Sequence, residues 1–144
     1  MAIEFKFVSS VTPVEYRKLN IASQAYAIGD AAMWNHTGSA TVDVVPATSS
    51  TVTSSIAAVS MEVHASTDTV GLFAIVTPWQ YWAADTANTA NAAHNNQRMV
   101  LTNASVVNNT GTDSAAGIFQ QTGLLGNIST TRIVGRFLAG FSAA

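Results

Sequence analysis

The sequence predicts an all-β protein, folded as a single antiparallel β-barrel or β-sandwich domain. The longest apolar run, residues 70–82 (VGLFAIVTPWQYW), is rich in branched and aromatic side chains, which favour the pleated conformation over a helix. Turn signals recur roughly every eight to twelve residues, the spacing of short strands in sandwiches and barrels. We therefore expect at most one or two short helices, joined to the strands by long loops rich in Asn, Ser and Thr.

The composition indicates one domain with an extensively contacted surface. A chain of 144 residues suits a single core, so residues 1–144 are taken as one domain. Only 10% of the residues are charged, against about 25% in an ordinary soluble domain. Small neutral side chains take the place of charges, which predicts a homo-oligomer in preference to a free monomer.

Several classes of function are disfavoured by the same composition. Six Lys and Arg residues at a net charge of −2 cannot form a basic patch, so we expect no nucleic-acid partner. The absence of cysteine excludes disulfides, zinc–thiolate sites and thiol nucleophiles. The N-terminus lacks the apolar segment of a secretory signal, and residues 70–82 are too short for a bilayer, which needs ~20 apolar residues, so no membrane partner is expected.

At the N-terminus, Ile3, Phe5 and Phe7 alternate with charged residues, which predicts a short amphipathic strand. Within residues 1–11 this strand is either an edge strand of the chain's own sheet or an arm that adds to a partner's sheet. The next segment, Thr12-Pro13-Val14-Glu15, fits a helix capping box and predicts a short helix that ends near Lys18 or Asn20.

The following third of the chain reads as strands joined by turns. Residues 25–34 form a strand interrupted at Gly29-Asp30, and they pair with residues 40–45 through a turn at 35–38. Pro46 closes this hairpin and a Ser/Thr-rich loop follows it. Residues 56–64 form another strand, and residues 66–68 turn the chain into the apolar run.

Residues 70–82 are expected to form the central strand. Both parities of the run are apolar, so Phe73 and Ile75 should be buried on one face while Ala74 is buried on the other. Pro78 has no amide donor and should end the central pairing.

The C-terminal half predicts one long loop and several short strands. Residues 83–97 have no apolar period and should form a loop with no more than one helical turn. The remaining strands are expected at residues 98–102 and 104–107 and around 118–119, 124–125 and 133–138.

No sequence pattern predicts a catalytic, cofactor or metal site. Glu62, His64 and Asp68 lie close in sequence, but they lack metal-ligand spacing and we interpret them as a solvated strand face. There is no nucleophile elbow and no glycine-rich phosphate loop followed by lysine.

Two groups of side chains are candidates for an interaction surface. Arg132 and Arg136 are four residues apart, which on a strand places both on one face, where they pair with Asp85 or Asp113 across an interface or remain solvated. The rings of residues 79–82 are either packed at the rim of the core or form a sugar-stacking platform.

Four stretches of the chain together resemble the decoration proteins, also called cement or head-stabilising proteins, of tailed bacteriophages. These stretches are AYAIGDAAMWNHTGSATVDVVPATSSTVTSSIAAVSME, YWAADTAN, RMVLTNASVVNNTGTDSAAGIFQQTGLLG and RIVGRFLAG, and they span residues 25–140. The similarity lies in composition and element order. It does not extend to the N-terminal strand.

The resemblance implies a small β-rich virion protein without catalytic residues, located on the outer surface of the capsid. Its expected partners are the major capsid protein of a tailed phage and further copies of itself, as a homotrimer. The alternative is a carbohydrate-binding module that uses the aromatic rim. The candidate interface residues are Ile3, Phe5, Phe7, Trp79, Tyr81, Trp82, Arg132 and Arg136.

Overall fold

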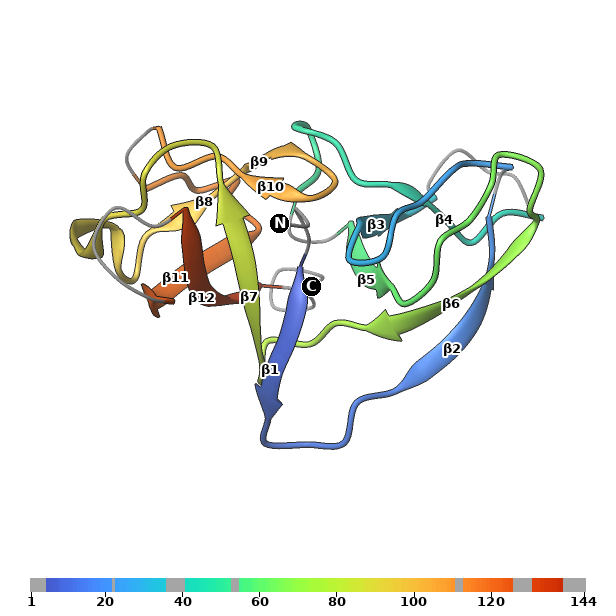
Figure 1. Cartoon of the computed structure of the whole chain (residues 1–144), viewed down its shortest axis with the longest axis horizontal. Coiled ribbons are helices and arrows are strands. Elements are labelled where there is room, and N and C mark those ends of the chain that lie inside the picture. Colours follow the sequence, from blue (N-terminus) through green and yellow to red (C-terminus); the bar gives the residue numbers. More distant parts are fainter. Residues whose placement is uncertain are drawn as a thin grey trace.

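The computed structural model describes residues 5–21, 23–35, 41–52, 55–110, 113–125 and 131–138. This part of the chain is all-β, as predicted, with one 3₁₀ turn, η1 (Ala92–His94), as its helical element. The strands form a larger and a smaller sheet (Figure 1). Their bounds are β1 Lys6–Ser10, β2 Tyr16–Asn20, β3 Ala31–Trp34, β4 Val44–Pro46, β5 Ile56–Ser60, β6 Val70–Ile75, β7 Gln80–Thr86, β8 Arg98–Met99, β9 Leu101–Asn103, β10 Val106–Val107, β11 Phe119–Leu124 and β12 Arg132–Phe137.

The larger sheet is nearly closed, like a barrel. Its strand order is β8-β11-β12-β7-β10-β9, and β1 also pairs with β7. The two terminal strands of this order, β8 and β9, are separated along the chain by Val100 alone. The described pairs are antiparallel except for β10 with β7, which is parallel.

The smaller sheet also brings its ends together. Its order is β2-β6-β5-β3-β4, and a bridge between Ile21 and Val44 links the chain after β2 to the start of β4. Next to this bridge, the amide of Asp43 donates to the carbonyl of Asn20, whose own amide donates to the Asp43 carboxylate at 2.8 Å. These contacts cover part of the two edge strands of the smaller sheet, which limits uncontrolled pairing with other chains.

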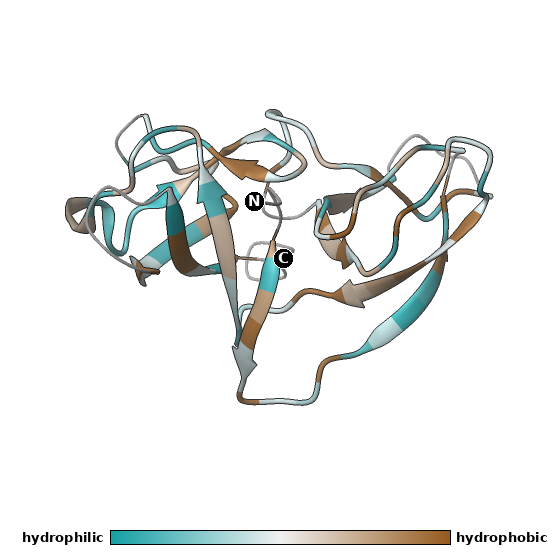
Figure 2. Ribbon diagram, in the orientation of Figure 1, coloured by the Kyte–Doolittle hydropathy of each residue, from teal (hydrophilic) through white to brown (hydrophobic). Residues whose placement is uncertain are grey.

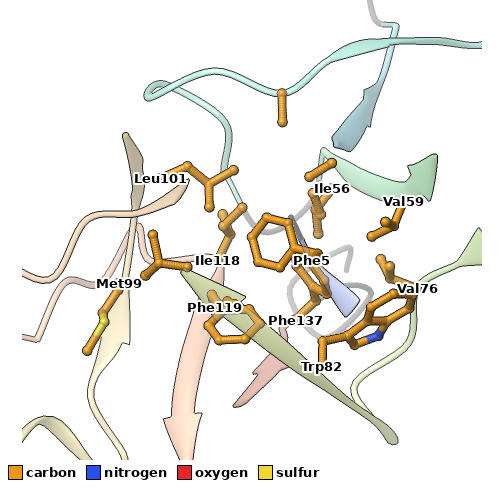
Figure 3. Close-up of a cluster of buried hydrophobic side chains, with 14 of the residues drawn as sticks. Phe5, Ile56, Val59, Val76, Trp82, Met99, Leu101, Ile118, Phe119 and Phe137 are labelled. Carbon is orange, nitrogen blue, oxygen red and sulfur yellow. The ribbon is translucent and has the colours of Figure 1, made fainter. Parts of the chain in front are cut away.

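Two apolar clusters form the core. The larger cluster combines residues of both sheets, including Phe5, Trp82, Phe119 and Phe137 (Figure 3). The second cluster is centred on Phe73. Since Phe73 belongs to the second cluster and its neighbour Ala74 to the first, β6 is buried on both faces, as predicted from its two apolar parities.

Residues 70–82 do not form one central strand, contrary to the prediction. They form β6 in the smaller sheet and the start of β7 in the larger sheet, and Pro78 lies in the turn between the strands. Pro78 does end the pairing, and Phe73 is fully buried, whereas Ile75 is half-buried. The apolar run is therefore one of two crossovers between the sheets, the other being the connection from β1 to β2.

The helix predicted after Thr12 is wrong. Residues 16–20 form β2, which pairs antiparallel with β6 from Tyr16–Ala74 to Asn20–Val70. Figure 2 shows β2 as largely hydrophilic and its partner β6 as largely apolar. A capping signal on a segment this short contributes little, and continuous pairing with a buried strand outweighs it.

Other predicted elements are present with different bounds. β3 and β4 form the expected hairpin, although most of the predicted turn at 35–38 lies outside the described residues. The predicted loop at 83–97 begins later, because β7 continues to Thr86, and it contains η1 as a single turn. The N-terminal strand begins at Lys6 and pairs with β7, which matches the edge-strand interpretation, while Ile3 lies outside the described residues.

Candidate interaction surface

The larger sheet separates the predicted interface residues onto two faces. Side chains alternate along a strand, so Gln80, Trp82 and Ala84 of β7 face the core, while Tyr81 and Asp85 face outward. We call this second side the outward face.

Phe5 and Trp82 were predicted at an interface, but both are fully buried in the chain's own core. Phe7 packs edge-on against Trp82, with ring centroids 5.6 Å apart. Phe5 and Trp82 are therefore core residues, whereas Phe7, which lies opposite Trp82 on β1, remains 37% exposed. Sequence alternation predicted the strand but could not show which sheet would cover it.

Two aromatic side chains remain exposed at the start of β7. Tyr81 is 37% exposed, and Trp79, which directly precedes the strand, is 50% exposed. Ser9 of β1 lies opposite Tyr81, and the amide of Val11 donates to the carbonyl of Trp79 at 3.4 Å. The backbone that carries the two rings is thus hydrogen-bonded along the edge that faces β1.

A buried glutamine anchors this part of β7. The Gln80 Oε1 accepts from the Thr77 amide and from the Trp82 Nε1, both at 3.1 Å. Its Nε2 donates to the carbonyl of Ile75 at 2.9 Å. One side chain therefore ties the end of β6, the turn and the core of the larger sheet together, and it was not singled out from the sequence.

Arg132 and Arg136 share the outward face, as their spacing predicted. Arg132 lies opposite Asp85 on β7, and its Nη1 is 2.8 Å from the carboxylate, with only 12% and 8% of the two side chains exposed. The expected pairing with Asp85 is therefore present, but it lies within the chain, between neighbouring strands.

Arg136 belongs to a polar row that crosses three strands. Gln120 lies opposite Arg98 of β8 on one side and Arg136 of β12 on the other. The Arg136 Nε donates to the Gln120 Oε1 at 3.0 Å, and the Gln120 Nε2 donates to the carbonyl of Asn96 at 2.9 Å. The β12–β7 register runs from Arg132–Asp85 to Gly135–Trp82. Continued by one position, it places Arg136 of β12 opposite Tyr81 of β7.

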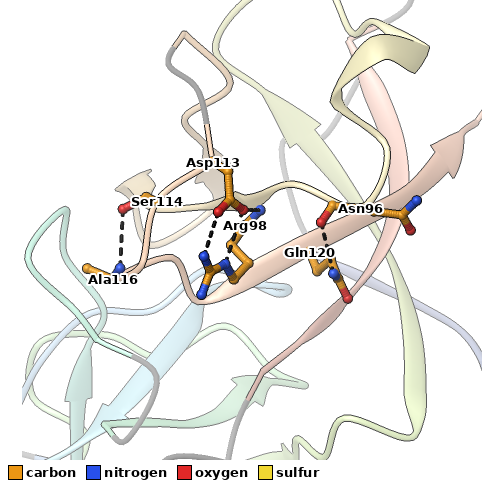
Figure 4. A network of polar contacts seen from close by, with 6 residues as sticks. All are labelled: Asn96, Arg98, Asp113, Ser114, Ala116 and Gln120. Carbon is orange, nitrogen blue, oxygen red and sulfur yellow. Dashed lines mark hydrogen bonds and ion pairs between the residues drawn. The ribbon is translucent and has the colours of Figure 1, made fainter.

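The end of this row is neutralised by a second ion pair. Arg98 donates to Asp113 through its amide, its Nε and its Nη2, at 2.8, 3.1 and 2.5 Å (Figure 4). Hydrogen bonds from the Arg98 side chain and amide lower the pKa of Asp113 to about 2. Gln120 and this pairing could not be found from sequence spacing, because the residues come from separate strands and loops.

His64 is not part of a solvated strand face, contrary to the prediction. It is 4% exposed, and its ring is stacked on Phe73 and edge-on to Tyr26. The Glu62 carboxylate is 3.5 Å from Nε2, and the Asp68 carboxylate is 3.7 Å from Nδ1. Since the two nitrogens point in different directions, the carboxylates do not converge on one point, and no group of three His, Asp or Glu side chains in the described residues is placed to hold a metal.

Nearby, burial governs the ionisation of two acidic groups. Burial, reinforced by the neighbouring Asp30 charge, raises the pKa of Tyr26 above its usual range. Burial also raises the pKa of Asp30, although a hydrogen bond from the Ala27 amide opposes this shift.

Among the described residues, no helix has the length and apolar character needed to cross a membrane. No protein-family model matches the chain, and no curated protein sequence matches it. The candidate surface is therefore defined by its own chemistry, as an outward sheet face that carries Trp79, Tyr81 and Arg136.

Proposed function

We propose that this chain is a structural virion protein that binds the outside of an assembled tailed-phage capsid and stabilises it. The observation that carries the proposal is the exposure of Trp79 and Tyr81 at the start of β7, the strand that pairs with the Arg136-bearing strand β12. Trp, Tyr and Arg are the residue types that dominate binding energy in protein interfaces. The partner in this proposal is the major capsid protein, and the protein acts as a homo-oligomer, a trimer by the resemblance described above.

The distribution of charge supports a partner bound mainly through apolar and backbone contacts. Three of the four arginines, Arg17, Arg98 and Arg132, form ion pairs with carboxylates of the chain itself. Few charges are left to steer binding or to be screened by salt. Attachment to a repeated lattice also gains effective concentration, and binding only to the assembled shell stabilises that shell by mass action.

The test adds purified protein to stripped particles of the phage that encodes it and counts the bound copies. Deleting the N-terminal strand would remove Phe5 from the core, so the informative variant is Trp79→Ser with Tyr81→Ser. The control is Val63→Ser, which removes an exposed apolar side chain between β5 and β6. We expect the double variant to lose occupancy on the particles and the control to bind like the wild type. The occupancy of the wild type and of the control should be the same at low and high salt.

Two results would contradict the proposal. If the wild-type protein binds isolated capsid subunits as well as it binds assembled shells, it does not recognise the lattice. If it binds neither shells nor subunits, the decoration function is refuted.

A carbohydrate-binding module is the second candidate. Trp79 and Tyr81 are exposed two positions apart, and two exposed rings at this spacing can stack on a sugar. Arg136, on the neighbouring strand β12, can supply hydrogen bonds to it. Trp82 is buried and takes no part in this alternative. Glycan-array binding that is lost in Trp79→Ser would favour the module over the virion protein.

A further inference from the structure

We infer that Arg136 is a docking site for a carboxylate side chain of the protein partner, and that Trp79 and Tyr81 accept an apolar residue next to that carboxylate. The inference rests on the proposed function for its partner class, which is protein. It adds the chemistry of the segment that the partner presents.

The first step is the geometry of Arg136. Its Nε is engaged by the Gln120 Oε1 at 3.0 Å, and Gln120 is itself held by the carbonyl of Asn96. This contact orients the guanidinium plane, while Nη1 and Nη2 have no hydrogen-bond partner in the described part of the chain. An oriented guanidinium with two free NH2 groups matches the paired oxygens of a carboxylate.

The second step is charge complementarity across the outward face. Arg98 and Arg132 are neutralised there by Asp113 and Asp85. Arg136 is the arginine that forms no ion pair among the described residues, although it lies between these two pairs. A partner segment bearing one negative charge therefore completes the face.

The third step is the apolar surface beside this charge. When the β12–β7 register is continued by one position beyond Gly135–Trp82, Tyr81 is the residue opposite Arg136, and Trp79 is exposed two residues earlier. Taking 150–250 Å² as the area of a large aromatic side chain, these two rings present roughly 200 Å² in total. That area suits one anchoring side chain, so the expected segment pairs an Asp or Glu with a nearby aromatic or aliphatic residue.

The experiment selects ligands from a library of random peptides displayed within a carrier loop, so that no free C-terminal carboxylate is present. The immobilised full-length protein should enrich sequences with an Asp or Glu close to an apolar residue. The best peptide is then measured against Arg136→Gln, Arg136→Lys and the control Lys18→Gln. Lys18→Gln removes one positive charge from exposed β2 in the other sheet.

We expect Arg136→Gln to weaken binding by about tenfold or more and Arg136→Lys to fall between it and the wild type, since lysine keeps the charge but loses the planar fork. Lys18→Gln should bind like the wild type. Enrichment of sequences without acidic residues, equal binding by Arg136→Gln, or no enrichment would each overturn the inference. Because no capsid is used, these outcomes are independent of the particle-binding test of the proposed function.

Discussion

The buried amide of Gln80 should be a major determinant of stability, and Gln80→Met tests this. Methionine keeps the length of the side chain but removes all three hydrogen bonds to Thr77, Ile75 and Trp82. A buried polar group left without its partner costs about 1–3 kcal/mol. The indole of Trp82 is fully buried, whereas Thr77 and Ile75 are half-buried, so the lower part of this range applies to the latter two.

The expected loss for Gln80→Met is therefore about 3–5 kcal/mol, a large part of the ~5–15 kcal/mol that stabilises a typical domain. In urea, with a slope of about 2 kcal/mol per molar, the unfolding midpoint should fall by about 2 M. Tryptophan fluorescence and circular dichroism follow the transition. The matched control is Gln24→Met, which changes an exposed glutamine and should shift stability by no more than about 0.5 kcal/mol.

A second substitution separates hydrogen bonding from packing. In Gln80→Glu, the charged carboxylate cannot donate to the Ile75 carbonyl, and its burial raises its pKa. The protonated form restores the donor, so this variant should gain stability relative to the wild type as the pH falls through the raised pKa. An unfolding midpoint for Gln80→Met equal to that of the wild type, or no pH dependence in the difference between Gln80→Glu and the wild type, would refute the reasoning.

Three further outcomes are expected. Phe73→Ala should cost ~3–5 kcal/mol in equilibrium unfolding, because it empties the centre of the second cluster, and an unchanged midpoint would remove Phe73 from the core. Gly71→Ala should be destabilising because the added Cβ would collide with the His64 ring. In a double-mutant cycle, His64→Ala should relieve this loss of stability, and a strictly additive cycle would contradict the contact. Because the pKa of Asp113 in the folded state is lowered to about 2, its pairing with Arg98 stabilises the fold at pH values above the ordinary carboxylate pKa, and this stabilisation is lost as the pH falls toward 2. An NMR titration of Asp113 with an ordinary carboxylate midpoint would contradict the pairing.

Much of the fold class could be read from the sequence because local patterns encode it. Alternating and continuous apolar runs, with turn residues between them, predicted the strands, the β3–β4 hairpin and the burial of Phe73. The spacing of Arg132 and Arg136 correctly placed both on one face. These features depend on residues close together in the chain, so side-chain alternation alone is sufficient.

Strand partners were decided by the tertiary structure. The capping signal at Thr12 predicted a helix, but the segment that follows it pairs as β2 with β6, which lies about fifty positions farther along the chain. The run 70–82 is divided between the two sheets. Likewise, only the packing of the folded chain shows that Phe5 and Trp82 are core residues while Tyr81 faces outward. The free energy of such pairing comes from burial against distant strands, which a local sequence pattern does not contain.

The composition of the chain determined that charges would be scarce, and the fold determined which of them remain available. Six basic residues in the sequence limit any electrostatic surface, whatever the topology. Their partners, Asp113 for Arg98 and Asp85 for Arg132, are 15 and 47 positions away along the chain, and only strand and loop geometry brings them within hydrogen-bonding distance. Ion pairs require atoms to meet within a few ångströms, so which arginine was left for a partner was settled by the tertiary structure.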